Sequence, residues 1–142
     1  MLSRLDKIDD FGEGLGELSA LRELVVDRCP APALPLGIAR LERLRSLTIR
    51  GCPNLRKLPA GLTALKNLRE LCAVDSGLTA LPDRIWDMPS LRKLDASGNQ
   101  IGYLPDDLSR SRSLRDVDVS GNPFDNPFKE LEKLLPLLSR LN

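Results

Sequence analysis

The sequence repeats itself with a period of about 23 residues, and this period limits the fold more than any other feature does. Similar nine-residue stretches, such as LRELVVDRC and LRKLDASGN, begin at Leu21, Leu44, Leu68, Leu91 and Leu114. Positions 1, 4 and 6 of each stretch are apolar, a spacing that fits neither a helix nor a strand alone. A repeat of this length is typical of a solenoid, in which each coil stacks on its neighbours.

Each stretch is followed by a second shared segment. These segments read LPLGIARLERL (34–44), LPAGLTALKNL (58–68), LPDRIWDMPSL (81–91) and LPDDLSRSRSL (104–114). Their apolar residues are spaced by four, three and three, which suits a helical or 3₁₀ turn. We therefore predict coils that each contain one short strand and one helical turn.

The two segments together resemble the leucine-rich repeat family, whose signature is LxxLxLxxN/C followed by LxxLP-type sequence. The resemblance covers roughly residues 18–126. It implies an α/β solenoid with a curved parallel sheet on its concave face and short helical turns on its convex face. The family's Asn or Cys position, where a side chain can satisfy backbone groups of the turn that leaves the strand, falls on Cys29, Cys52, Ser76, Asn99 and Asn122.

We expect a single domain over residues 1–142, with repeats over 18–126. Residues 1–17 form a degenerate half-coil, in which Phe11, Leu15 and Leu18 match Leu34, Ile38 and Leu41 one period later. A strand of this coil would begin near Met1, and we therefore expect the sequence to start inside a larger protein.

Residues 127–142 are predicted to form a C-terminal cap helix. Asn126 before Pro127 is a helix start signal. An apolar stripe is predicted to cover the core of the last coil, and it contains Phe128, Leu131, Leu134, Leu135 and Leu138. Pro136 should end or bend this helix.

Composition argues against several functions. The net charge is +1 and only 4% of the residues are aromatic, so we expect no binding to nucleic acid or to a membrane. The chain has no histidine and no phosphate loop, so we expect no catalysis, metal or cofactor. Three cysteines are too few for a secreted disulfide framework, which favours a reducing, cytoplasmic location.

The cysteines allow two interpretations. Cys29 and Cys52 occupy the same repeat position on adjacent coils, so a disulfide is geometrically conceivable, but a reduced, inward-facing pair is favoured. Cys72 falls at an outward position of its strand. It has no recognisable base to activate it, and LCAVD lacks the CxD spacing of bacterial ubiquitin-ligase domains, so we interpret Cys72 as a contact residue.

Positions 3, 5 and 7 of the strands alternate with buried positions and should face the concave side. These outward positions vary freely within the chain, whereas the buried positions hardly vary, so packing does not dictate them. A small apolar seam (Val25, Cys72, Val74) and an acidic corner (Asp95, Asp116, Asp118) favour a protein-binding surface over a merely solvated face. The predicted contact residues are Val25, Asp27, Thr48, Arg50, Cys72, Val74, Asp95, Ser97, Asp116, Asp118 and Ser120.

Two further features have alternative interpretations. Position 2 is arginine in all five coils, which suggests phosphate or glycan binding. We favour a structural or solubility role, because Glu23, Glu70 and Asp116 lie beside these arginines. Trp86 replaces small residues of other coils on the convex side, so it either covers a gap between coils or is an exposed contact.

These observations predict a monomeric, non-catalytic module that recognises a protein partner. The 23-residue consensus resembles the target-recognition domains of bacterial effectors that are injected into host cells, and we favour such a domain, acting in the cytosol of the host. GCPNLRKLP (51–59) also resembles repeats of plant intracellular immune receptors. A third alternative is the targeting arm of a truncated enzyme, such as a ubiquitin-ligase effector. An extracellular receptor would require a signal peptide and paired cysteines.

Overall fold

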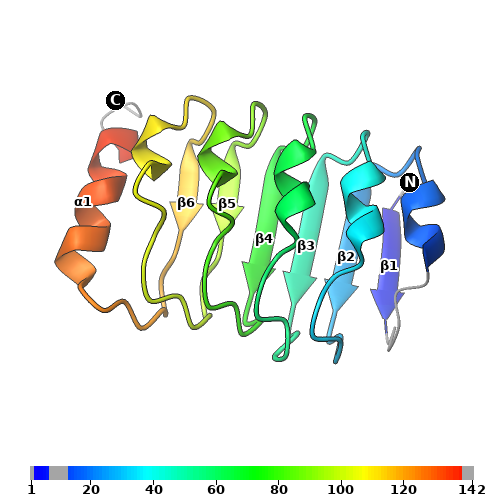
Figure 1. The fold of residues 1–142 in the computed structure, drawn as a ribbon, viewed down its shortest axis with the longest axis horizontal. Coiled ribbons are helices and arrows are strands. Elements are labelled where there is room, and N and C mark those ends of the chain that lie inside the picture. Colours follow the sequence, from blue (N-terminus) through cyan, green and yellow to red (C-terminus); the bar gives the residue numbers. More distant parts are fainter. Residues whose placement is uncertain (1, 7–12, 139–142) are drawn as a thin grey trace.

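A computed structural model describes residues 2–6 and 13–138, and within these ranges the strands form one parallel sheet in chain order (Figure 1). The strands are β1 (Leu2–Asp6), β2 (Glu23–Asp27), β3 (Ser46–Arg50), β4 (Glu70–Val74), β5 (Lys93–Asp95) and β6 (Asp116–Asp118). The five strands that the repeats predict are confirmed. β1 adds another at the N-terminal end, where the degenerate coil was expected to begin, and pairs with β2.

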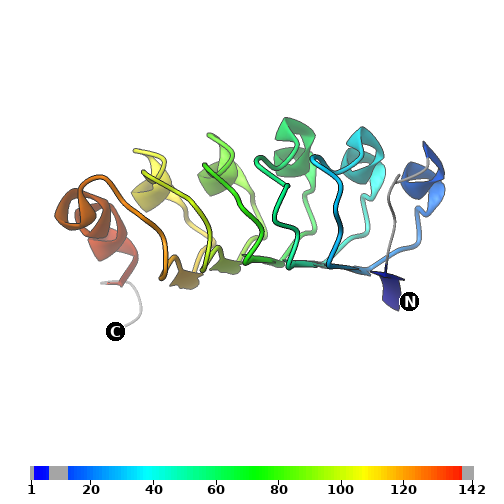
Figure 2. The same cartoon turned by 90° about the horizontal axis from the view of Figure 1, so that it is seen from below.

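A 3₁₀ helix follows each of the first five strands, and these helices form a second layer on one side of the sheet (Figure 2). They are η1 (Glu13–Glu17), η2 (Leu36–Arg40), η3 (Ala60–Ala64), η4 (Ile85–Asp87) and η5 (Leu108–Arg110). The Leu-Pro pairs explain where the last four turns begin, because the proline carbonyl accepts the first i to i−3 bond. In η2, for example, the Ile38 N–H donates to the Pro35 carbonyl at 3.2 Å.

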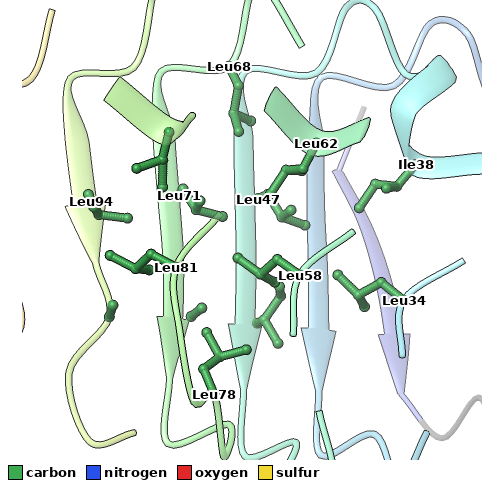
Figure 3. Packing of buried hydrophobic residues seen from close by; sticks show 14 of the residues in the cluster. Leu34, Ile38, Leu47, Leu58, Leu62, Leu68, Leu71, Leu78, Leu81 and Leu94 are labelled. Atoms are coloured by element: carbon green, nitrogen blue, oxygen red, sulfur yellow. The ribbon is translucent and has the colours of Figure 1, made fainter. Parts of the chain in front are cut away.

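The core fills the space between the sheet and the 3₁₀ helices (Figure 3). Position 4 of the strands supplies Leu24, Leu47, Leu71 and Leu94, each at most 1% exposed. The 3₁₀ helices supply Ile38 and leucines such as Leu62 from the opposite side. The two mixed spacings in the sequence thus describe the two walls of one core, and the predicted solenoid of strands and helical turns is confirmed.

The backbone is left-handed at position 8, in the turn that leaves the strand, in every repeat from β2 onward. The φ angles there are 52° at Arg28, 60° at Gly51, 50° at Asp75, 68° at Gly98 and 67° at Gly121. A positive φ is easy for glycine and unfavourable for other residues. Arg28 and Asp75 therefore hold a strained conformation that the fold imposes.

Helix α1 (Pro127–Leu138) lies at the C-terminal end of the array, as predicted, but its orientation differs from the prediction. Three residues of the expected core-facing stripe are exposed: Phe128 is 81% exposed, Leu131 58% and Leu135 57%. The side that faces the last coil instead carries buried Leu137, half-buried Leu134 and a pair of charged residues.

These charged residues, Glu130 and Lys133, explain the orientation. The last coil presents the backbone of Leu104, which needs hydrogen-bond partners. The Leu104 N–H donates to Glu130 Oε2 at 2.6 Å, and its carbonyl accepts from Lys133 Nζ at 2.7 Å. Lys133 Nζ also contacts Glu130 Oε2 and Asp106 Oδ1, each at 2.9 Å.

Pro136 was predicted to end or bend the helix; the first of these alternatives is wrong, because α1 continues through Pro136 to Leu138. A proline removes one hydrogen bond to the carbonyl four residues earlier. That carbonyl belongs to Glu132, which is exposed, so water can replace the lost donor.

At the other end of the solenoid, Leu18 is 45% exposed although its counterpart Leu41 is fully buried, since Leu18 lies in the terminal coil.

Candidate functional site

The face of the sheet opposite the 3₁₀ helices presents positions 3, 5 and 7 of the strands. In β4 the order is exposed Glu70, buried Leu71, half-buried Cys72, buried Ala73 and half-buried Val74. β2 has the same alternation, and β3 and β5 follow it closely. The residues proposed from sequence as contacts therefore share one face, on the side of the sheet away from the core.

The parallel register aligns these residues in rows across the sheet. Position 5 forms one row, in which neighbours pair directly: Val25, Thr48, Cys72, Asp95 and Asp118. Position 3 forms a second row of Glu23, Ser46, Glu70, Lys93 and Asp116. In the third row Asp27 pairs with Arg50 and Arg50 with Val74. With strands about 4.8 Å apart, these side chains form one continuous surface.

The apolar seam is less continuous than the sequence suggested. Cys72 and Val74 lie two residues apart on the same face of β4. Val25 lies on β2, and Thr48 of β3 stands between it and Cys72 in the same row. The structure thus brings together Cys72 and Val74 but not Val25.

The acidic corner, by contrast, is brought together. Asp95 and Asp118 are direct partners on β5 and β6, and Asp116 lies in the neighbouring row beside Lys93. The carboxylates of Asp95 and Asp118 are both oriented by a serine two residues later. Asp118 Oδ1 accepts from the Ser120 backbone N–H at 2.9 Å and from its hydroxyl at 2.7 Å.

Asp95 and Ser97 repeat this geometry at 3.1 and 2.7 Å. The hydrogen bonds from Ser120 lower the pKa of Asp118 below its ordinary value, so this carboxylate stays charged. Sequence reasoning placed Ser97 and Ser120 among the contacts but missed this orienting role. The repeated Asp-x-Ser pattern in DAS (95–97) and DVS (118–120) was the available signal.

The thiol of Cys72 sits in the middle of the face and is kept protonated. Partial burial raises its pKa; Lys93 acts in the opposite direction, and Asp95, Glu70 and Asp116 raise the pKa further. A raised pKa lowers the fraction of nucleophilic thiolate. The environment of Cys72 therefore favours a packing contact over covalent chemistry.

The Asn or Cys positions lie at the exits of the strands and bond to the backbone of neighbouring coils. Asn99 Nδ2 donates to the carbonyls of Ala73 and Ala96 at 2.6 and 2.9 Å. Asn122 makes the corresponding bond to Ala96 at 2.9 Å. The shorter Ser76 hydroxyl donates only to the Val74 carbonyl, at 2.8 Å.

Cys52 fills the same role in an earlier coil, and neither Cys29 nor Cys52 is part of a disulfide. The Cys29 N–H donates to Cys52 Sγ at 3.4 Å, and this thiol donates to the Arg50 carbonyl at 3.4 Å. Burial raises the pKa of Cys52 despite the opposing hydrogen bond from Cys29. Cys52 thus acts here as a small hydrogen-bonding core residue.

Trp86 lies on η4, on the side of the solenoid away from the sheet. It is half-buried and packs against the core, and it also lines a surface pocket between η4 and η5. That pocket includes Met88, Pro89, Arg110 and Arg112. Trp86 therefore covers core and presents surface at the same time.

Among the residues that the structure describes, no group of three or more His, Cys, Asp or Glu side chains is placed to bind a metal ion. No helix within residues 2–6 and 13–138 is both long and apolar enough to cross a lipid bilayer.

Comparisons with known proteins agree with the geometry of the coils. A sequence model described as Leucine Rich Repeat matches residues 90–111, the coil that contains β5 and η5. The leucine-rich repeat protein LIC12759 of Leptospira interrogans is 27% identical, with a TM-score of 0.82 over 98% of this chain and 36% of its own. The leucine-rich repeat domain of the type III effector XopL is 24% identical, with a TM-score of 0.77 over 88% of this chain and 45% of its own. The chain thus spans less than half the length of either.

Proposed function

The chain is a leucine-rich repeat solenoid, and on that basis we propose that it is a non-catalytic module that recognises a protein partner through the exposed face of its sheet. Leucine-rich repeat domains generally bind proteins. The observation that carries the proposal is the contrast between the two faces of the same strands. The inward face carries only aliphatic residues, with a buried leucine at position 4 of β2 to β5, whereas the outward face presents acidic, basic, hydroxyl, thiol and aliphatic side chains at fixed spacing.

The proposed contact surface has two parts. The half-buried patch of Cys72 and Val74 would provide apolar area at the centre of the interface, where desolvation contributes most to affinity. The acidic corner of Asp95, Asp116 and Asp118 would accept a basic side chain and guide the approach of the partner. Because the backbone of each strand is already hydrogen-bonded on the sheet, little ordering entropy opposes binding.

The test is a paired capture experiment from plant and animal cell lysates, read by mass spectrometry. The variant Val25→Arg/Val74→Arg/Asp118→Arg changes the proposed face. A matched control, Leu36→Arg/Ala60→Arg/Asp83→Arg, adds the same charge at exposed positions on the side of the 3₁₀ helices. A protein retained by the parent and the control but lost by the sheet-face variant would support the proposal. Equal retention by all three would refute it.

We further propose that the module is the target-binding part of a larger bacterial effector that acts in the host cytoplasm. The fold similarity to the XopL domain supports this at the level of fold alone. Two alternatives share the same repeats: the targeting arm of an enzyme such as a ubiquitin ligase, and a segment of a plant immune receptor. The genomic neighbourhood and a reporter for type III delivery separate these three, because only an effector would be translocated into host cells.

We also propose that the module binds as a monomer. Sedimentation equilibrium over a wide concentration range tests this directly, since self-association would increase the apparent mass with concentration.

A further inference from the structure

The edge of the sheet where the strands begin carries a row of arginines. Position 2 of the repeats places Arg22, Arg45, Arg69, Arg92 and Arg115 on successive coils. The backbone bonds are in register: the Arg92 N–H donates to the Arg69 carbonyl at 2.8 Å, and the Arg115 N–H donates to the Arg92 carbonyl at 2.8 Å. The backbones of neighbouring arginines in this row are therefore about 4.8 Å apart.

The last three arginines of this row line an open pocket together with a fourth, Arg112, which precedes β6. The pocket has a volume of about 440 Å³, and its other lining residues are Pro89, Ser90 and Ser113. All four arginines are exposed, and no carboxylate lines the pocket.

The acidic neighbours in the sequence form no ion pair with the arginines of this pocket. Glu70 and Asp116 directly follow Arg69 and Arg115, and from sequence we expected them to balance the arginine row. Within residues 2–6 and 13–138, however, no ion pair within 4.0 Å joins any of the four arginines of the pocket to a carboxylate. The four guanidinium groups are therefore exposed to solvent and not held by a carboxylate within that distance.

The same edge differs in the coil that contains Arg45. Arg112 stands three residues before Arg115, and the residue three before Arg45 is Glu42. A carboxylate thus stands at the repeat position that a guanidinium occupies at the C-terminal end. The position lies outside the buried core in both coils, so packing does not require arginine there.

The guanidinium of Arg115 is also held in place. Its Nη1 donates to the carbonyls of Arg112 and Leu114, each at 2.9 Å. A guanidinium has five N–H donors in a rigid fork that matches the oxygens of a phosphate group. With one nitrogen fixed to the backbone, the other donors remain for a ligand at a reduced entropic cost.

From this geometry we propose that the arginine pocket, defined by Arg69, Arg92, Arg112 and Arg115, binds the phosphate groups of a phosphorylated compound. The volume exceeds that of one phosphate ion, so a pyrophosphate or a phosphate ester fills it better than a single ion. The pocket that includes Trp86 shares Pro89, Arg112 and Ser113 with it, so the ester portion of such a ligand can extend toward the tryptophan.

Trp86 allows ligand binding to be measured by fluorescence, because it lies beside the pocket and is the only tryptophan in the chain. We would titrate the protein with sodium pyrophosphate at constant ionic strength and follow tryptophan fluorescence, with calorimetry as a second readout. Arg92→Gln/Arg112→Gln removes two charges from the pocket. Arg43→Gln/Arg45→Gln removes two charges from the same edge outside it, and circular dichroism checks that both variants fold.

The expected result is saturable binding that becomes about tenfold weaker or more in Arg92→Gln/Arg112→Gln, because each lost charge-assisted bond is worth about a factor of ten. The Arg43→Gln/Arg45→Gln control should bind like the parent. No saturable binding by the parent would overturn the proposal. An equal loss in both variants would also overturn it, since the effect would then be that of net charge.

Sedimentation with vesicles distinguishes two carriers of the phosphate group. Vesicles of phosphatidylcholine with a phosphatidylinositol phosphate would pull down the parent, but not the pocket variant, if the ligand is a lipid headgroup. Pyrophosphate binding without vesicle binding would assign the pocket to a soluble phosphate compound.

Discussion

The backbone N–H of Ser76 donates a hydrogen bond of 2.9 Å to Oδ1 of Asn99, one coil further along the chain. The same oxygen accepts the Leu78 N–H at 3.2 Å, while the amide nitrogen of Asn99 binds the Ala73 carbonyl at 2.6 Å. All of these atoms are buried. The side chain of Asn99 thus provides hydrogen-bond partners for backbone groups where the chain leaves two successive strands, β4 and β5.

Asn99→Ala should therefore destabilise the protein by about 2–4 kcal/mol, because it leaves several buried backbone groups without partners. Urea unfolding followed by circular dichroism measures this loss. Asn54→Ala is the matched control: Asn54 donates to the Pro30 carbonyl at 3.1 Å, but in an exposed setting. A loss of similar size in the control would contradict the role assigned to burial.

Arg28→Gly should increase stability by about 1 kcal/mol, because Arg28 has a φ of 52° that glycine adopts without strain. Its ion pair with Asp27 is long, at 3.8 Å, and the Arg28 side chain is 81% exposed, so little is lost with it. Gly51→Ala tests the same position one coil later, where φ is 60°, and should decrease stability. A melting temperature that falls in Arg28→Gly would show that the strain is not relieved.

Lys133→Ala should weaken the docking of α1 at a cost of about 3–5 kcal/mol, because it leaves the buried carboxylate of Glu130 without its cation. Chemical unfolding measures the loss. Lys129→Ala removes an exposed lysine from the same helix and should change stability by less than about 0.5 kcal/mol. Equal effects of the two substitutions would exclude a specific role for the buried pair.

The same contacts predict a pH dependence at both ends of the scale. The hydrogen bond from Lys133 lowers the pKa of Asp106. The stability that this bond contributes is therefore present above the pKa of Asp106 in the unfolded chain, and it is lost as pH falls through the pKa in the folded protein. Burial acts to lower the pKa of Lys133, but its bonds to Asp106 and Glu130 outweigh burial and raise it. The stability contributed by the bonds of Lys133 is present below its pKa in the unfolded chain and is lost as pH rises through its pKa in the folded protein.

Melting temperatures of the parent and of Lys133→Ala between about pH 3 and pH 11 would check this prediction, since these limits bracket the ordinary values for Asp and Lys. The difference between the two proteins should be largest near neutrality and shrink toward both extremes. A constant difference across the range would contradict the assignment.

The orientation of α1 predicts unequal effects of two neighbouring leucines. Leu137 is 5% exposed and Leu135 is 57% exposed. Leu137→Ala should destabilise the protein by about 2–5 kcal/mol, and Leu135→Ala by less than about 1 kcal/mol. Thermal unfolding of both variants measures the effect, and the reverse order would restore the orientation expected from the apolar stripe.

The repeats were predictable from sequence because each leucine column occurs several times and its spacing directly reflects the geometry of a coil. The orientation of α1 was not predictable, because it depends on the backbone N–H and carbonyl of one residue, Leu104. These two groups need an acceptor and a donor from the helix. An amphipathic pattern counts Glu130 and Lys133 as solvent-facing residues and gives no sign that they neutralise each other against the last coil.

The outward face was likewise predictable as a set of positions but not as a pattern of contacts. Alternation along each strand placed Val25 and Cys72 on the same side, yet only the order of the strands shows that Thr48 separates them. The arginine row was visible in the sequence. The contribution of Arg112 becomes clear only when the turn before β6 is seen to bring it beside Arg92 and Arg115.

The chain order of the strands has a consequence for how the protein folds. Since β1 to β6 lie in sequence order, every pairing between strands closes a segment of about one coil, and none requires distant parts of the chain to meet. Folding can therefore start at any well-packed central pair of coils and spread outward in both directions, with one short loop closed at each step. A break in the middle of the array would then divide it into two halves that melt separately, so the spread of unfolding along the solenoid can be followed coil by coil with hydrogen exchange.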